Sequence, residues 1–248
     1  MKPLLLAVLL FAICGCTASK QTVTTIQRIP ATFDFSPPSR VQVGNANMTV
    51  ALIRPSYGSK DPEFYVPPFT DMASSMAGDF EEMLTAKGFT IKGPYGSRDE
   101  MVYTDKVNSD FAFEVTIDPK PTYNRRYTTI TNWGTIVDKN AAQNFFKMNG
   151  EVTFSGRLTI TAKAPQYGEK LWIKNIDIQP QSFTYVGSAK WVNIPSMADE
   201  LKQDNVVYNT VSRELEKYYA AAFNLCWQQI DPAEMKTIAA QAKRADKK

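Results

Sequence analysis

The sequence has 248 residues, 44% of them hydrophobic, which is enough for one domain with a buried core or for two small domains. Its 28 Lys and Arg residues nearly balance 25 Asp and Glu residues, and a net charge of +3 gives no reason to infer nucleic-acid binding. The chain contains no histidine, which excludes Ser-His-Asp triads, Cys-His nucleophiles and His-ligated zinc. Catalysis by paired carboxylates, Lys or Tyr stays open.

The first residues have the form of a bacterial lipoprotein signal. Lys2 supplies a short basic region, and the apolar run 4–13 is about half the ~20 residues that span a bilayer. The run ends in the sequence ICGC, whose last residue is Cys16. An aliphatic residue three before a cysteine and a small residue directly before it form the pattern that lipoprotein signal peptidases cut. We therefore expect Cys16 to become the acylated N-terminus; the alternative is an ordinary secretory signal followed by two cysteines.

The remaining cysteines fit this interpretation. Cys14 would leave with the signal and Cys16 would carry acyl chains such as palmitate, so Cys226 alone would remain and no internal disulfide could form. Cys226 lies in the apolar stripe of an expected helix and is predicted to be a small buried side chain. Thr17, rather than Asp, follows the lipidated cysteine, which favours the outer membrane.

Three regions follow from these signals and from composition. Residues 1–15 are the expected signal peptide, and residues 16–45, rich in Ser, Thr and Pro, are the expected lipidated tether. Residues 46–248 are expected to form a single α+β domain with a C-terminal helical extension.

The first half of the domain predicts a strand at 48–54, a loop at 56–68, a helix at 70–87 and a short strand at 89–92. Gly88 stands at the C-cap of the helix. Clean alternation from Phe111 predicts a half-buried strand. Residues 119–146 have no convincing period and predict an exposed excursion.

The second half predicts a strand at 148–163, a hairpin turn at 164–169 and a returning strand from 171 to 178 that continues towards 186. Gly156 falls in the inward row and indicates a bulge. A capping box at Ser196 and Asp199 precedes a long helix at 205–230, and a last helix follows to about residue 244.

This order of elements predicts an α+β fold. We expect a mixed or antiparallel sheet of about four to five strands, covered on one face by helices, with a long amphipathic C-terminal helix.

The sequence shows no phosphate-binding loop, dinucleotide fingerprint, Cys-x-x-Cys pair or calcium loop, and its carboxylates have no catalytic spacing. We therefore expect a protein that is not an enzyme and that needs no cofactor or metal. A hydrolase of envelope polymers would require two close acids in a cleft.

One segment, residues 120–133, combines basic and aromatic side chains. The candidate ligand-binding residues are Lys120, Tyr123, Arg125, Arg126, Tyr127 and Trp133. Aromatic faces stack on sugar rings and guanidinium groups bind carboxylates, so the set suits an acidic saccharide such as a sialylated glycan. It suits a protein partner equally well, and an ordinary strand edge rich in Thr and Tyr is the third alternative.

Three stretches resemble the neuraminyllactose-binding haemagglutinin lipoprotein family, also described as flagellar-sheath adhesins. They are the sequence VALIRPSY at 50–57 with the following helix and KGFTI at 87–91, the segment 150–178 with its LTITAKAP core, and the C-terminal helix with its Lys-rich tail. With the lipoprotein signal, the order of elements agrees over nearly the whole chain.

The resemblance implies an outer-membrane or flagellar-sheath lipoprotein whose adhesive role is inferred from binding to sialylated glycans. That binding has been attributed to a short Lys/Arg-rich motif after the third strand. This chain instead has the sequence YNRRY at 123–127, so Arg125 and Arg126 correspond to the motif by position and charge. A structural lipoprotein that docks on a flagellar or secretion apparatus is the competing hypothesis, and surface or periplasmic orientation stays open.

Overall fold

The computed structural model describes residues 26–130, 145–187, 190–191 and 196–245. Its strands are β1 (Thr49–Ile53), β2 (Ser56–Tyr57), β3 (Thr90–Tyr95), β4 (Phe111–Ile130), β5 (Phe145–Lys163), β6 (Lys170–Val186) and β7 (Lys190–Trp191). Its α-helices are α1 (Phe69–Ala86), α2 (Tyr103–Val107), α3 (Met197–Gln203), α4 (Asn205–Gln229) and α5 (Pro232–Ala245). Two 3₁₀ turns, η1 (Pro62–Tyr65) and η2 (Arg98–Glu100), lie in the connections.

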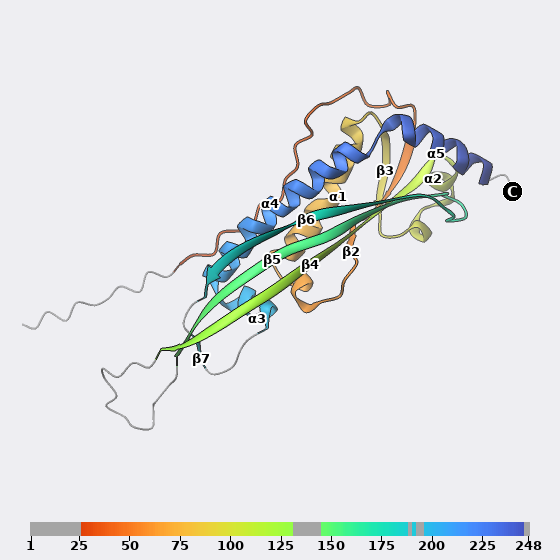
Figure 1. Cartoon of the computed structure of the whole chain (residues 1–248). Helices are drawn as coiled ribbons and strands as arrows, with labels where there is room; N and C mark the ends of the chain where they lie inside the picture. Colours follow the sequence, from red (N-terminus) through yellow and green to blue (C-terminus); the bar gives the residue numbers. More distant parts are fainter. Residues whose placement is uncertain (1–25, 131–144, 188–189, 192–195, 246–248) are drawn as a thin grey trace, which may run out of the picture.

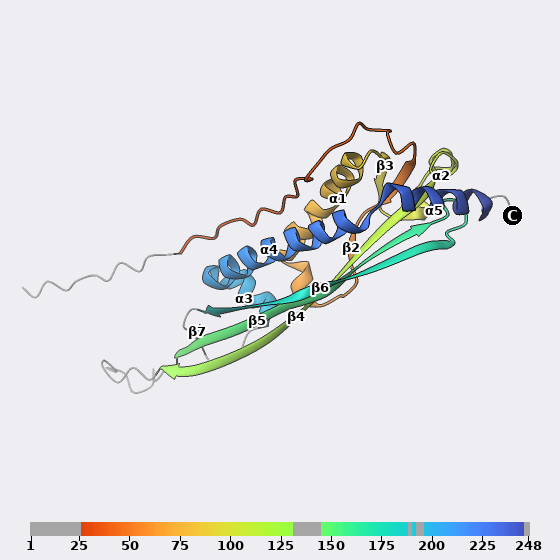
Figure 2. The same cartoon turned by 45° about the horizontal axis from the view of Figure 1, so that its top comes forward.

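The strands form one mixed sheet in the order β3-β1-β4-β5-β6, shown in Figure 1. β1 is parallel to β3 and β4, whereas β5 is antiparallel to both β4 and β6. The short β2 and β7 pair with β4 and β5. In Figure 2 the helices α1 and α4 lie on one face of this sheet. The predicted α+β fold, with a sheet covered on one face by helices, is confirmed.

The core lies between the sheet and the two long helices. Alternate residues of β4 and β5 point into it, and so does the apolar stripe of α4. The core members that the sequence pattern singles out are all buried: Phe111, Phe113, Val115, Ile117, Val152, Phe154, Leu158, Ile160, Val207, Val211, Leu215, Tyr218, Ala222 and Cys226. Complete burial of these side chains is the main source of stabilisation, at about 1.5–3 kcal/mol for each large one.

The expected helix boundaries are present. Gly88 has φ = +90°, the left-handed conformation that ends a helix with glycine. Ser196 accepts a hydrogen bond from the backbone N–H of Asp199 at the start of α3. Asp231 accepts one from the N–H of Ala233 (2.9 Å), which caps the restart into α5.

The expected excursion after residue 118 is wrong over the part that the structure describes. β4 continues unbroken to Ile130 and pairs with β5 residue by residue. Pro119 and Pro121 interrupt the sequence pattern but not the strand. On the side of β4 away from β5, the pairing with β1 and β2 ends at Ile117, and from Asp118 onward that edge pairs with no described strand. Proline is tolerated on such an edge. Residues 131–144 of the expected excursion lie outside the described residues.

The expected tether also differs from the structure from Ile26 onward. Residues 26–47, here called the N-terminal strap, run along α4 and then reach the end of α1 (Figure 2). Phe33 and Phe35 from the strap are buried in the core. The polar composition of this segment indicates a free spacer, but two aromatic side chains are enough to fix it against the helices. The division of the chain into residues 1–15, 16–45 and 46–248 stays a prediction.

Candidate functional site

The long β4–β5 hairpin determines where the predicted site residues lie. Successive side chains of a strand point to opposite faces, so odd-numbered residues of β4 face the helices and even-numbered ones face away. Tyr123 and Arg125 are therefore on the helix-covered face, and Lys120 and Arg126 are on the open face. The structure does not bring these four residues into one cluster. Tyr127 lies in β4 but its side chain is not among those described, and Trp133 and Cys16 lie outside the described residues.

On the helix-covered face, Arg125 joins the hairpin to α3. Its Nη1 lies 3.3 Å from Oε1 of Glu200, a carboxylate that is 1% exposed. Tyr185 of β6 donates to the other oxygen of Glu200 at 3.3 Å. Because both groups engage a buried charge, Arg125 serves the interior rather than an external ligand.

Tyr123 extends the same network toward η1. Its hydroxyl donates to Glu63 Oε1 at 3.5 Å, and the Arg125 guanidinium lies 6.0 Å from its ring centroid. Burial and the neighbouring Glu63 carboxylate raise the pKa of Tyr123 well above its usual range. Tyr123 therefore stays protonated and acts as a hydrogen-bond donor inside the fold.

On the open face, Arg126 lines a pocket of about 290 Å³ that is partly open to solvent. Two cross-strand rows line it, Arg126, Asn149 and Val186 in one and Asn124, Glu151 and Thr184 in the next, and the pair Gly150 and Tyr185 between these rows completes the lining. The pocket thus offers one guanidinium, one carboxylate, two amides and a hydroxyl. This set can donate to a ligand carboxylate and exchange hydrogen bonds with hydroxyl groups.

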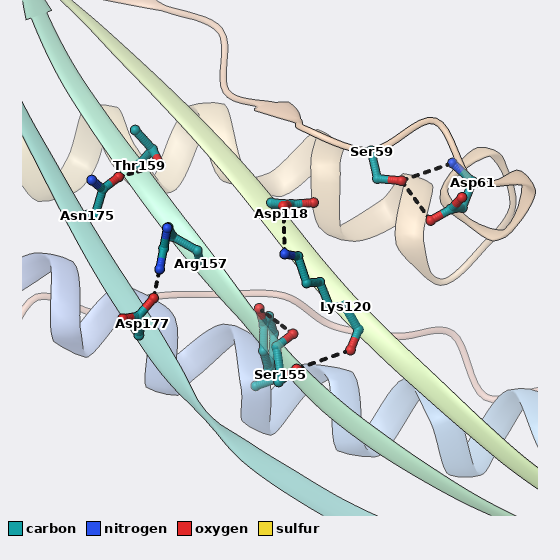
Figure 3. Close-up of polar contacts among 10 residues, drawn as sticks. Ser59, Asp61, Asp118, Lys120, Ser155, Arg157, Thr159, Asn175 and Asp177 are labelled. Carbon is teal, nitrogen blue, oxygen red and sulfur yellow. Dashed lines mark hydrogen bonds and ion pairs between the residues drawn. The ribbon is translucent and has the colours of Figure 1, made fainter.

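The open face beyond the pocket is polar and internally paired, as Figure 3 shows. Arg157 lies 2.8 Å from Asp177, and this pairing raises the pKa of the guanidinium further. Lys120, 69% exposed, lies 3.9 Å from Asp118. Thr159 donates to Asn175 at 3.0 Å. The solvated ion pairs contribute little to stability, so this stretch reads as a hydrated surface.

Two buried groups elsewhere have altered acid–base properties but lie in the core. Burial raises the pKa of Asp79, which accepts a 2.6 Å hydrogen bond from Tyr219. Burial likewise raises the pKa of the Cys226 thiol. The prediction that Cys226 is a small buried side chain is confirmed, and burial in apolar surroundings makes it inert.

Neither a metal centre nor a membrane span is present in the described part of the chain. No group of Cys, Asp and Glu side chains there could hold a metal ion. None of the described helices has the length and apolar composition that crossing a bilayer requires. Glu151 is the single acid among the residues lining the pocket, so the paired acids of a hydrolase are not found in it.

Sequence reasoning missed most of the pocket and all of the buried network. Asn124 lies inside the predicted segment, but Asn149 and Glu151 come from β5, which pairs with β4, and Thr184 comes from β6 one strand further on. If the alternation of inward and outward side chains is continued through Pro119, it places Arg125 and Arg126 on opposite faces of the strand. Glu200 carried a weaker signal, as one of two acids in the first turn of α3, which also holds Met197 and Ala198.

No family model and no curated protein sequence matches the chain. Among solved structures, it is similar to a Helicobacter pylori protein described as a neuraminyllactose-binding hemagglutinin homolog, with a TM-score of 0.57 and 12% identity over 87% of this chain and 100% of that chain. A Neisseria meningitidis lipoprotein matches with a TM-score of 0.28 and 11% identity over 68% of this chain and 96% of that one. At these identities the first likeness shows a shared fold, and the second is too weak to carry an argument.

Proposed function

We propose that this protein is a non-enzymatic lipoprotein of the outer membrane that binds a hydroxyl-rich ligand, a glycan, in the pocket beside Arg126. The pocket is the observation that carries the proposal. It places a guanidinium, a carboxylate and two amides around about 290 Å³ of partly open space. Such side chains fix sugar hydroxyls by direct hydrogen bonds.

Other observations support parts of the proposal. The Ile-Cys-Gly-Cys16 sequence supports lipid attachment, and Thr17 supports the outer membrane. The fold shared with the hemagglutinin homolog supports an adhesin-like role. Arg126 suits the carboxylate of a sialylated glycan, whereas Glu151 disfavours a second negative charge nearby. We therefore expect a ligand with at most one acidic group.

A glycan array tests the pocket. The chain produced from residue 17 onward should bind a subset of neutral or monoacidic glycans, and Arg126→Ala should weaken that binding about tenfold or more. Lys120→Ala is the matched control, since Lys120 lies on the same face but outside the pocket. No binding, or equal binding by the Arg126→Ala variant, would remove the pocket from the proposed function.

The second candidate is a structural lipoprotein that docks on a flagellar or secretion apparatus. Two features favour it. The outer edge of the 17-residue β6 pairs with no described strand. The open face also has no aromatic side chain that could stack on a sugar ring among its described positions from 114 to 126, 149 to 163 and 173 to 186. Such an edge is a place where a second protein can add a strand. Crosslinking in whole cells supports this candidate if the protein enters a large complex and resists external protease.

A further inference from the structure

The N-terminal strap lies along α4 in a fixed register. The side-chain amide of Asn205 donates to the carbonyl of Ile26 at 2.8 Å. Asn209 donates to the carbonyl of Gln27 and accepts from the N–H of Ile29, both at 2.8 Å. These bonds replace the strand partners that an extended chain usually has, so the segment is held by side chains of the helix.

Arg28 fixes the start of the strap at the junction between α3 and α4. Its Nη2 donates to the last carbonyls of α3, those of Leu201 and Lys202, at 2.5 and 2.9 Å. Its guanidinium lies 4.1 Å from the ring centroid of Tyr208. A cation at a helix C-terminus and over an aromatic face is stabilised by both contacts.

The strap then follows α4 for most of its length. Phe33 packs edge-on against Tyr219, with 5.3 Å between ring centroids, and Phe35 lies 5.2 Å from Phe223. Asn205 to Phe223 spans about 27 Å along the helix axis, and nine extended residues from Ile26 span about 30 Å. The strap is therefore almost fully extended and has no slack.

The start of the strap lies at the same end of the molecule as the last described residues of β4. Arg28 binds the C-terminal end of α3, and Arg125 of β4 pairs with Glu200 in the same helix. Figures 1 and 2 both show α3 and the end of β4 at the end where the described chain begins, with α2 and α5 at the other end.

We propose that the strap orients the anchored domain, so that the α3 end is the surface that meets the bilayer. This inference rests on lipid attachment at Cys16 in the proposed function. About ten residues separate Cys16 from Ile26 and reach at most ~35 Å, whereas the 20 residues of β4 alone extend about 66 Å. An inverted domain, with α5 against the lipid, would need a longer linker between Cys16 and Ile26. A free tether to Ala46 would reach about 100 Å and would permit it.

Energy transfer to the membrane tests the orientation. Full-length acylated protein is placed in phosphatidylethanolamine–phosphatidylglycerol vesicles with an acceptor dye on the lipid headgroups. A donor dye is attached at Gln203→Cys, an exposed position at the end of α3, or at Tyr167→Cys, an exposed position in the β5–β6 turn. The buried Cys226 thiol, with its raised pKa, does not compete for the label. Transfer from position 203 should exceed transfer from position 167 about twofold or more, because the short linker after Cys16 holds the α3 end nearer to the membrane.

A variant with a longer linker between Cys16 and Ile26 provides the matched control. Inserting about forty Gly and Ser residues after Ser19 leaves the described fold untouched and should bring the two efficiencies together. Equal transfer in the acylated parent, or greater transfer from position 167, overturns the orientation while leaving lipid attachment intact. A mature N-terminus without acyl chains in mass spectrometry overturns both the anchor and the orientation that depends on it.

Discussion

Tyr185 lies directly opposite Gly150 in the β5–β6 pair, and its ring covers the place where a side chain at position 150 would stand. A Cβ built on Gly150 would overlap the ring and the hydroxyl of Tyr185. From this position the Tyr185 hydroxyl reaches Glu200 on α3. The glycine therefore makes room for a contact that ties the hairpin to the helical layer.

Gly150→Ala should displace the Tyr185 ring and weaken its bond to Glu200. We expect the free energy of unfolding to fall by about 1–3 kcal/mol, as in other overpacked cores, measured by urea denaturation. Gly78→Ala is the matched control. Gly78 lies within α1 with no atom near its Cβ position, so alanine should stabilise the helix by about 0.5–1 kcal/mol. An alanine at 150 that is as stable as the parent would contradict the packing described.

Arg125 and Arg126 are neighbours in sequence, but replacing Arg125 should lower the stability of the fold far more than replacing Arg126. Arg125→Met removes the ion pair of a carboxylate that is 1% exposed, and we expect a loss of about 3 kcal/mol in stability. Arg126→Met, on the open face, should change stability by less than about 0.5 kcal/mol. Adding Glu200→Gln to Arg125→Met should recover part of the loss, which a double-mutant cycle would measure. Equal losses from the two arginine variants would show that the face assignment is mistaken.

Much of the fold could be predicted because its signals are local. The stripe of α4, the alternation around Phe113 and the glycine after α1 each reflect the geometry of one element. The extension of β4 past Pro119 could not be predicted in this way. The strand there is held by its pairing with β5, whose residues lie 37 to 15 positions further along the chain. On its inner face, Tyr123 contacts Glu63 of η1 and Arg125 contacts Glu200 of α3.

The candidate site could be predicted in part. The segment 120–133 was expected to carry ligand-binding residues, and that expectation stays a prediction. Of its two arginines, Arg126 lines the pocket and Arg125 does not, because the two side chains occupy opposite faces of the sheet. That assignment requires the register between β4 and β5. The strap was missed for a related reason: Phe33 and Phe35 are two isolated apolar residues whose partners, Tyr219 and Phe223, lie near the other end of the chain.

Asp79 should make stability depend on pH in a direction opposite to that of a salt-bridged acid. Burial raises its pKa above the ordinary value of 3.8, although the Tyr219 hydroxyl opposes the shift. The native state then binds a proton more readily than the unfolded state, so this contribution is complete below pH 3.8 and is lost as pH rises through the raised pKa. The parent should therefore gain stability relative to Asp79→Asn as pH falls from 7 toward 4. A stability difference that is independent of pH would contradict the raised pKa.

Phe35 should determine whether the N-terminal strap stays bound. Its side chain is 4% exposed and packs on Phe223 and Trp227, and its backbone N–H binds Asp79. Phe35→Ala should lower the free energy of unfolding by about 3–5 kcal/mol and should expose the strap to hydrogen exchange and to limited proteolysis before the sheet opens. Ile29→Ala, which truncates a side chain that is 66% exposed in the same strap, should leave both readouts unchanged. If the strap of the Phe35→Ala variant exchanged no faster than that of the parent, its attachment would have to depend on its other contacts with α3 and α4, which include those of Arg28, Thr32 and Phe33 and those of the two asparagines of α4.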